Sequence, residues 1–422
     1  MTSSAPAVPA WINSAANWLT PNRIRAQAFV LALCLWGVCA VDFATPSLFD
    51  RAGNIKFQDF LQFYISARLI NQGRSSQLFD QRVADAEMRA IVREPNRVQL
   101  PTVYGPQVGL LFTPLARMSF PAAARIWAAL SLLVVAACFY LLWATCPALR
   151  SQARTVAICA VAFPPLFHFF VRGQISALLL LCLSAAFLAF RADRNWLAGV
   201  ALGCLVFKPQ FLVAIPLVLL LAQAWKAFAG LALSAAGQLA LTTLYFGANV
   251  MRAYFDTMLH VSRWVGLSEI GPAHIQMHSL RSFFTLLIPE PTIALALYVV
   301  TSIAAIAIAA AVWRSSATLA VRFSALILTS VLVNPHLFIY DLLILAPASL
   351  LLVDWVLRAK PAAAPTLLVL LYLSYLLPLF GPLSRWTHLQ LSVLAFAALL
   401  WVLWRCSEIP IHRLAANQPA VV

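Results

Sequence analysis

The sequence predicts an all-α polytopic membrane protein with about 12 transmembrane helices and a large loop after the first of them. Of its 422 residues, 62% are hydrophobic and only 10% are charged, and the mean hydropathy is +0.86. A soluble protein of this length needs many more charges to cover its surface. The apolar residues also gather in windows that approach the ~20 residues a helix needs to cross a bilayer.

Several of these apolar windows are short, so the expected number of spans is between 10 and 13. The windows lie near residues 26–44, 122–144, 155–171, 175–190, 196–207, 210–224, 228–246, 290–313, 323–340, 342–357, 364–380 and 388–404. The first is too long for a signal-peptide core and lacks a clear cleavage site, so we expect a retained helix. We expect a single integral-membrane domain over residues 1–422, with short tails at 1–25 and 405–422.

The distribution of basic residues predicts the orientation of the chain. With a cytoplasmic N-terminus, every cytoplasmic connection carries Lys or Arg, namely Arg150, Arg154, Arg191, Arg194, Lys226, Arg314, Arg322, Arg358, Lys360, Arg405 and Arg413. The opposite short loops hold one each, namely Arg172, Lys208 and Arg385. The positive-inside rule therefore places both termini in the cytoplasm. We expect a multi-pass protein of a bacterial inner (plasma) membrane, with its long loops extracytoplasmic.

The net charge of +15 does not indicate a nucleic-acid partner, because the charges lie in short clusters at helix ends. The eight cysteines include no CxxC pair and indicate neither a metal site nor disulfides. We therefore expect the lipid bilayer as a partner, no nucleic acid, no metal and no other cofactor.

Residues 46–121 form the first long outer loop. Within it, apolar residues recur at helical spacing and predict an amphipathic helix at the membrane surface that ends at Gly73; they are Phe60, Phe63, Tyr64, Ala67 and Ile70. The apolar stretch 108–118 predicts a second interfacial helix. The other long outer segment is 247–289, which is rich in Arg, His and Trp.

Asp59 at the start of the predicted surface helix is the candidate catalytic residue. A carboxylate there gains from the helix dipole and the free amide groups, so one interpretation makes it only an N-cap. The other makes it a general base that accepts a proton from a sugar or lipid hydroxyl. The residues alone leave both interpretations open.

Cations and histidines at predicted outer helix ends form a second candidate group: Arg172, Lys208, Arg263, Arg281, Arg385, His278 and His336. Lys208 lies between two apolar runs, where an unpaired charge costs a few kcal/mol. Snorkelling to the headgroups accounts for any one of these residues. Several on one face fit a bound phosphate better, because Arg binds phosphoryl oxygens in bidentate fashion and Lys supplies a compact charge.

A third feature is the segment 334–341, where Pro335 interrupts an apolar run beside His336 and Asp341. Membranes tolerate such breaks where the freed backbone groups line a cavity. The alternative is an ordinary kinked turn with Asp341 as a cap. Gly173 and Gln174, after Arg172, form a similar polar interruption.

These motifs together resemble glycosyltransferase family 87. The resemblance rests on an ordered set over residues 59–345: Asp59-Phe60, Tyr64, Ala67-Arg68, Gly73, Leu78-Phe79, Tyr104-Gly105-Pro106, Thr113-Pro114-Leu115-Ala116, Gly173-Gln174, Lys208-Pro209, His278-Ser279-Leu280, Pro335-His336 and Tyr340-Asp341. Gly105 and His278 depart from residues that are common in the family at these positions.

The resemblance implies a GT-C-type membrane fold and a polyprenyl-phosphate sugar as donor, bound with its phosphate at the outer face. It implies that Asp59 is the catalytic base and that Lys208, His336 and nearby arginines hold the phosphate. The candidate donor-binding residues are Lys208, His336, Arg172, Gln174, Arg281, His278, Tyr104 and Asp341. The expected reaction is transfer of a hexose such as mannose, or of a pentose, to a lipid or glycan acceptor with inversion.

Two other classes of protein remain as alternatives. A secondary transporter or lipid-linked-saccharide flippase predicts internal repeats and polar residues near the middle of broken helices, and neither is evident. A non-catalytic membrane scaffold leaves the outer cations without a role.

Overall fold

The computed structural model describes residues 8–92, 102–264 and 275–408, apart from the side chains of 261–264. Within these ranges every regular element is helical, and extended pairing is limited to two isolated bridges. The all-α prediction is confirmed. The helices are α1 Ala10–Trp18, α2 Pro21–Ala44, α3 Gln58–Asn71, α4 Gln81–Val92, α5 Pro106–Leu111, α6 Phe120–Ala144, α7 Ala153–Val161, α8 Pro164–Arg172, α9 Ser176–Arg191, α10 Asn195–Gly203, α11 Ile215–Leu221, α12 Trp225–Phe246, α13 Ala248–Trp264, α15 Leu280–Leu287, α16 Pro291–Arg314, α17 Leu319–Leu332, α18 Leu345–Ala359, α19 Ala364–Leu376, α20 Ser384–Thr387 and α21 Leu391–Ser407.

Each of the predicted apolar windows coincides with an apolar helix or a pair of helices. Among the described residues, six helical segments are long and apolar enough to cross a membrane, or seven if a bent pair counts as one span. The other five are shorter, namely 176–191, 195–207, 209–221, 319–332 and 391–407. The chain is therefore a membrane protein, and the number of 12 spans stays a prediction.

Proline interrupts two of the windows that were predicted as single helices. The window 155–171 is two helices, α7 and α8, bent by 46° at a break of a few residues. Pro164 and Pro165 open α8 and have no N–H to continue the hydrogen bonds of α7. Likewise α17 ends at Leu332, before Pro335, and the chain resumes in the 3₁₀ helix Ile339–Ile344.

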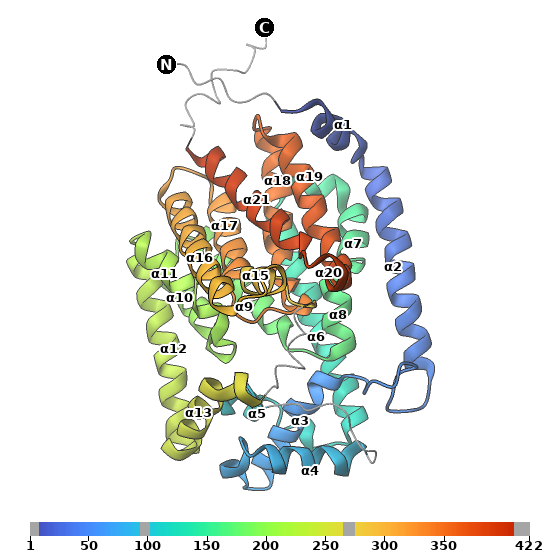
Figure 1. Ribbon diagram of the computed structural model, residues 1–422, viewed down its shortest axis with the longest axis vertical. Coiled ribbons are helices and arrows are strands. Elements are labelled where there is room, and N and C mark those ends of the chain that lie inside the picture. The colour runs from blue at the N-terminus through green and yellow to red at the C-terminus, as the bar shows by residue number, and fades with distance from the viewer. Residues whose placement is uncertain (1–7, 93–101, 265–274, 409–422) are drawn as a thin grey trace.

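The helices of the first long loop, together with α13 of the second long outer segment, lie at one end of the molecule (Figure 1). Figure 1 shows the long helices running roughly along the long axis, with α3, α4, α5 and α13 gathered at the lower end. The helix α1 and the last turns of α21 lie at the upper end. The side of the membrane on which each end lies stays a prediction. The terminal residues 1–7 and 409–422 lie outside the described part of the chain.

The predicted surface helix in the first loop exists as α3, and Gly73 follows it with a positive φ of 71°. The amphipathic interpretation is wrong for this helix, because nine of its 14 residues are buried and they lie on all its sides. It packs against α5 and the start of α6. The amphipathic helix of this loop is instead α4, which buries Ala84, Met88 and Val92 at intervals of four residues. The stretch 108–118 divides between α5 and a 3₁₀ turn at Leu115–Arg117.

Two hydrophobic clusters meet where the candidate residues lie. The larger one fills the bundle from α6 to α21, and the smaller one surrounds α3 and includes Ile175. Phe170 and Phe207 pack against both clusters. The polar residues next to them in the sequence, Arg172, Gln174 and Lys208, therefore lie at the junction of the two clusters.

Candidate active site

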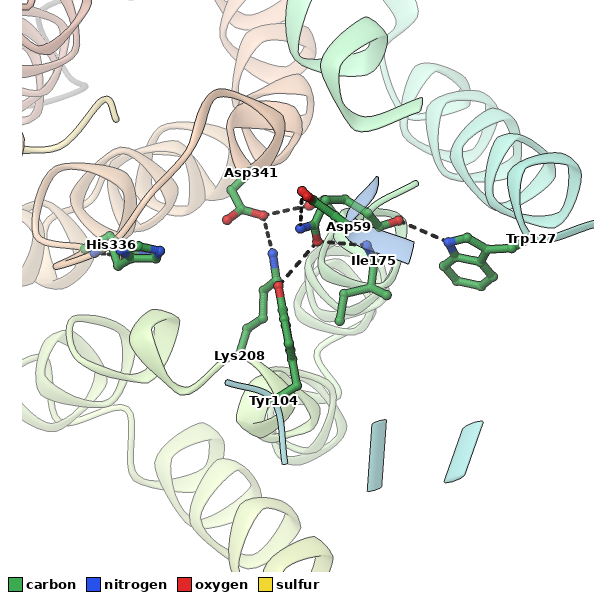
Figure 2. Close-up of polar contacts among 10 residues, drawn as sticks. Asp59, Tyr104, Trp127, Ile175, Lys208, His336 and Asp341 are labelled. Atoms are coloured by element: carbon green, nitrogen blue, oxygen red, sulfur yellow. Dashed lines mark hydrogen bonds and ion pairs between the residues drawn. The ribbon is translucent and has the colours of Figure 1, made fainter. Parts of the chain in front are cut away.

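Three interruptions of the helical pattern meet at this junction. The first is the turn between α8 and α9, which carries Gln174 and leads into Ser176, the first residue of α9. The second is Lys208, which lies between two short 3₁₀ helices, Cys204–Phe207 and Pro209–Leu212. The third is the 3₁₀ helix Ile339–Ile344, which carries Asp341. Figure 2 shows Lys208 and Asp341 converging with Asp59 at the start of α3. Broken helices thus supply buried polar groups at one place.

Asp59 lies in the first turn of α3, but it is not the N-cap. The helix begins at Gln58, and the N-cap is Phe57 in the left-handed conformation, with no side-chain cap hydrogen bond. The interpretation of Asp59 as an N-cap is therefore wrong. Its carboxylate is buried and instead accepts a hydrogen bond from Nε2 of Gln174 at 2.8 Å. Its other oxygen lies 3.7 Å from a guanidinium nitrogen of Arg172.

The side-chain amide of Gln174 donates a hydrogen bond to Asp59 and also accepts hydrogen bonds. Its Oε1 accepts hydrogen bonds from the hydroxyl of Tyr104 at 3.3 Å and from the backbone N–H of Ile175 at 3.2 Å. Both ends of the amide are therefore engaged, and the amide is oriented with its N–H towards the carboxylate. Its amide N–H contacts Asp59 in the structure, and the predicted binding of the donor by Gln174 stays a prediction.

The turn that carries Gln174 is fixed by tight packing and by a tryptophan. Gly173 has a φ of 70°, and a Cβ atom there would lie 2.8 Å from the Cβ of Phe60. The indole N–H of Trp127 donates to the carbonyl oxygens of Gly173 and Gln174 at 3.2 and 3.3 Å. From the sequence alone, Trp127 near the start of the window 122–144 is most simply an interface anchor. That interpretation is wrong, because the residue is buried.

Lys208 and Asp341 form a buried ion pair. The ammonium nitrogen lies 2.5 Å from Oδ1 of Asp341, and the two side chains are only 1% and 2% exposed. The hydroxyl of Ser176 donates to the same oxygen at 2.6 Å. The ammonium also lies over the rings of Tyr104 and Tyr340, 5.7 and 5.2 Å from their centroids, where cation–π attraction adds to the pair. Lys208 therefore does not snorkel to the headgroups.

Two of these residues, Ser176 and Tyr340, were not among the predicted site residues, although a signal for each was present. Ser176 follows the polar interruption Gly173-Gln174, and Tyr340 directly precedes Asp341. Both types are common in apolar helices as packing residues, so neither is distinctive without its neighbours in space. Asp341 lies 133 residues from Lys208 and 165 residues from Ser176 along the chain.

The charges in the cluster are matched in sign. Asp59 faces Arg172, and Asp341 faces Lys208, so the four groups carry no net charge when all are ionised. Burial raises the pKa of Asp59 above its ordinary value, while Arg172 and the hydrogen bond from Gln174 act in the opposite direction. A carboxylate with a raised pKa is a stronger proton acceptor than an ordinary aspartate, as a general base requires.

The remaining candidate residues lie apart from this cluster. His278 is fully buried, and its Nδ1 lies 2.8 Å from the hydroxyl of Ser392. Burial lowers the pKa of His278 to about 3, so it is neutral near pH 7 and supplies no charge. His336 is exposed, and Figure 2 shows it turned away from Lys208. Arg281 and Arg385 are also exposed, and the side chain of Arg263 lies outside the described residues.

A backbone contact nevertheless ties the segment of His278 to that of Asp341. Met277 and Phe338 form an isolated antiparallel bridge, with the N–H of His278 donating to Leu337 at 3.0 Å. Gln276, in the same segment, accepts a hydrogen bond from Arg172 at 2.9 Å. The part of the second long outer segment that the structure describes therefore braces the guanidinium beside Asp59. Among the described residues no group of three or more His, Cys, Asp or Glu could hold a metal ion.

Comparison with known proteins identifies a family. The chain matches Glycosyltransferase family 87 over residues 102–335, which is more than half of its length. Searches of curated proteins and of solved structures find no match. The matched range contains Tyr104, Gln174 and Lys208, while Asp59 and Asp341 lie outside it. The resemblance seen in the motifs is confirmed: the chain belongs to glycosyltransferase family 87 and is a membrane glycosyltransferase.

Proposed function

We propose that this glycosyltransferase moves a sugar from a polyprenyl-phosphate donor to an acceptor hydroxyl on the extracytoplasmic side, with inversion at the anomeric carbon. The sugar is a hexose such as mannose, or a pentose. The observation that carries the proposal is the buried Asp59 carboxylate, held by Gln174 with Arg172 beside it. The location in a bacterial inner membrane is part of the same proposal.

The proposed reaction is a single displacement. The acceptor hydroxyl gives its proton to the Asp59 carboxylate as its oxygen forms a bond to the anomeric carbon. The bond from that carbon to the phosphate oxygen breaks, and the polyprenyl phosphate leaves with the electron pair. One displacement inverts the configuration. The base contributes by accepting the proton in the transition state, and cations contribute by stabilising the charge that grows on the phosphate.

Arg172 and Lys208 are the proposed ligands of the donor phosphate. The side chain of Arg172 is 32% exposed, so a ligand next to the base can reach it. Lys208 has three N–H donors, and the one directed at Asp341 leaves others for a phosphate oxygen. His336 and Arg281 stay as proposed contacts at the exposed rim. This scheme uses side-chain cations and needs no metal.

The reaction is tested by comparing membranes with and without the gene. We expect mass spectrometry of membrane lipids and glycans to show a species that lacks one hexose or one pentose in the deletion strain. The wild-type gene should restore it, and a gene encoding Asp59→Asn should not. An unchanged lipid and glycan profile would contradict transfer to either class of acceptor.

The proposed side of the reaction is tested by labelling. Ser75, in the 3₁₀ turn Ser75–Gln77, lies in the first long loop, and all predicted cytoplasmic connections are basic. A cysteine at Ser75 should therefore react with a membrane-impermeant maleimide in intact spheroplasts. A cysteine at Arg314, at the end of α16 on the predicted cytoplasmic side, should react only after lysis. The opposite pattern would place the loop and Asp59 in the cytoplasm.

A further inference from the structure

A wide groove lies between the start of α4 and α13, outside the cluster around Asp59. Its volume is about 540 Å³, which is within the range of small-molecule sites. Its lining includes Ser76, Phe79, Asp80, Arg82, Asp256 and His260. Figure 1 places α4 and α13 at the same end of the molecule as α3. The groove is therefore on the side that carries the proposed active site.

The lining of the groove fits a neutral hydroxyl-rich ligand. Asp80 and Asp256 are exposed carboxylates, which accept hydrogen bonds, and Arg82 is an exposed donor. Two carboxylates against one guanidinium disfavour a phosphate or another anion. Phe79 adds an aromatic surface and is fixed by packing against the ring of Tyr254 at 5.6 Å between centroids. Carboxylate, guanidinium and aromatic groups together match the hydroxyls and the C–H faces of a sugar.

The groove is connected to the proposed base through Phe79. This residue also lines a small cavity of about 10 Å³, and Tyr104 lines the same cavity. The hydroxyl of Tyr104 donates to Gln174, and Gln174 donates to Asp59. Phe79 and the small cavity therefore link the groove to the side chains that hold Asp59.

The groove also opens beside an apolar surface. On α13, Phe255 and Leu259 are one turn apart and are 49% and 75% exposed. They lie on a different face of the helix from Asp256 and His260, which line the groove. At the end of α12, Leu244 and Tyr245 are 81% and 66% exposed. Exposed apolar residues on an amphipathic helix in a membrane protein fit the lipid interface.

We propose that the groove between α4 and α13 binds the acceptor, and that the acceptor is a neutral saccharide headgroup carried on a lipid. The saccharide lies along Phe79 between Arg82 and Asp256, and the lipid lies against the exposed face of α13. This inference rests on the proposed function, because it assigns the acceptor to the reaction for which Asp59 is the base.

Occupancy of the groove is measured without turnover. A cysteine at Ser76 in a Cys34→Ser background reacts with a maleimide, and the glycolipid fraction of the source membranes should slow this labelling at least threefold. The oligosaccharides released from that fraction should protect only at much higher concentration, and vesicles of phosphatidylglycerol should not protect. Equal protection by the released oligosaccharides would overturn the lipid part of the inference. Protection by phosphatidylglycerol, or by none of the three probes, would overturn the saccharide site.

The contribution of the groove to catalysis is measured with the same glycolipid fraction as acceptor. Asp256→Ala and Arg82→Ala should each raise the acceptor concentration at half-maximal rate about tenfold, the effect of losing one charge-assisted hydrogen bond. The donor concentration at half-maximal rate should not change. Matched controls are Arg252→Ala on α13 and Arg89→Ala on α4, exposed residues that do not line the groove. If the wild-type protein transfers sugar and the groove variants behave like these controls, the inference is overturned.

Protection of the Ser76 cysteine by glycolipid, without any sugar transfer by the wild-type protein, would instead contradict the proposed function. The groove would then remain a saccharide site.

Discussion

Asp59→Asn should lower the rate of sugar transfer by ~10²–10⁴ while leaving the protein folded, because this is the typical contribution of a general base. The asparagine oxygen still accepts the hydrogen bond from Gln174, so α3 stays tied to the turn after α8. The ion pair with Arg172 is lost, but it is long at 3.7 Å and its arginine is partly exposed, so it contributes little stability. The measurement is the maximal rate of the purified protein with saturating donor and acceptor.

The matched control for this prediction is Asp85→Asn. Asp85 lies in α4, where it accepts a hydrogen bond from Gln81 at 2.8 Å, and its substitution should leave the rate within about twofold. Because burial raises the pKa of Asp59, the wild-type rate should fall on the acid side at a pH above that of an ordinary aspartate. This acid limb should be absent from Asp59→Asn. A variant that elutes normally, binds donor and keeps the wild-type rate would show that the carboxylate is structural only.

Lys208→Met and Asp341→Asn should each destabilise the protein by about 3–5 kcal/mol, because each leaves an uncompensated charge in a buried site. The double variant removes both charges and should lose clearly less than the sum of the two single losses. The measurement is the free energy of unfolding in a denaturing detergent for wild type, both single variants and the double variant. Because Lys208 is also a proposed phosphate ligand, the variants that remain folded should bind donor more weakly.

Arg405→Met is the matched control for the buried pair. Arg405 pairs with Glu408 at 3.4 Å, and the two side chains are 59% and 45% exposed, so water replaces the lost partner. Its substitution should cost no more than about 1 kcal/mol. Losses at Lys208 and Asp341 that simply add in the double variant would mean that the two side chains do not depend on each other. A double variant as stable as wild type would mean that the pair serves function rather than stability.

The sequence by itself determined the class of this protein. The share of apolar residues and the length of the apolar windows are properties of the chain, and a bilayer selects helices because every backbone group must be satisfied within the segment. The polar interruptions at Gly173-Gln174, Lys208-Pro209 and Pro335–Asp341 were also visible, because charges and proline stand out in apolar runs. Their order along the chain was enough to identify the family.

Only the tertiary structure shows which residues of these interruptions contact one another. The pairing of Lys208 with Asp341, and the attachment of Asp59 to Gln174, join residues 133 and 115 positions apart. No local pattern encodes such contacts, because they depend on how broken helices pack between two hydrophobic clusters. The same reason explains the errors at α3 and Trp127. Helical spacing and position along a helix predict which residues share a face, whereas burial on the remaining faces depends on what packs there.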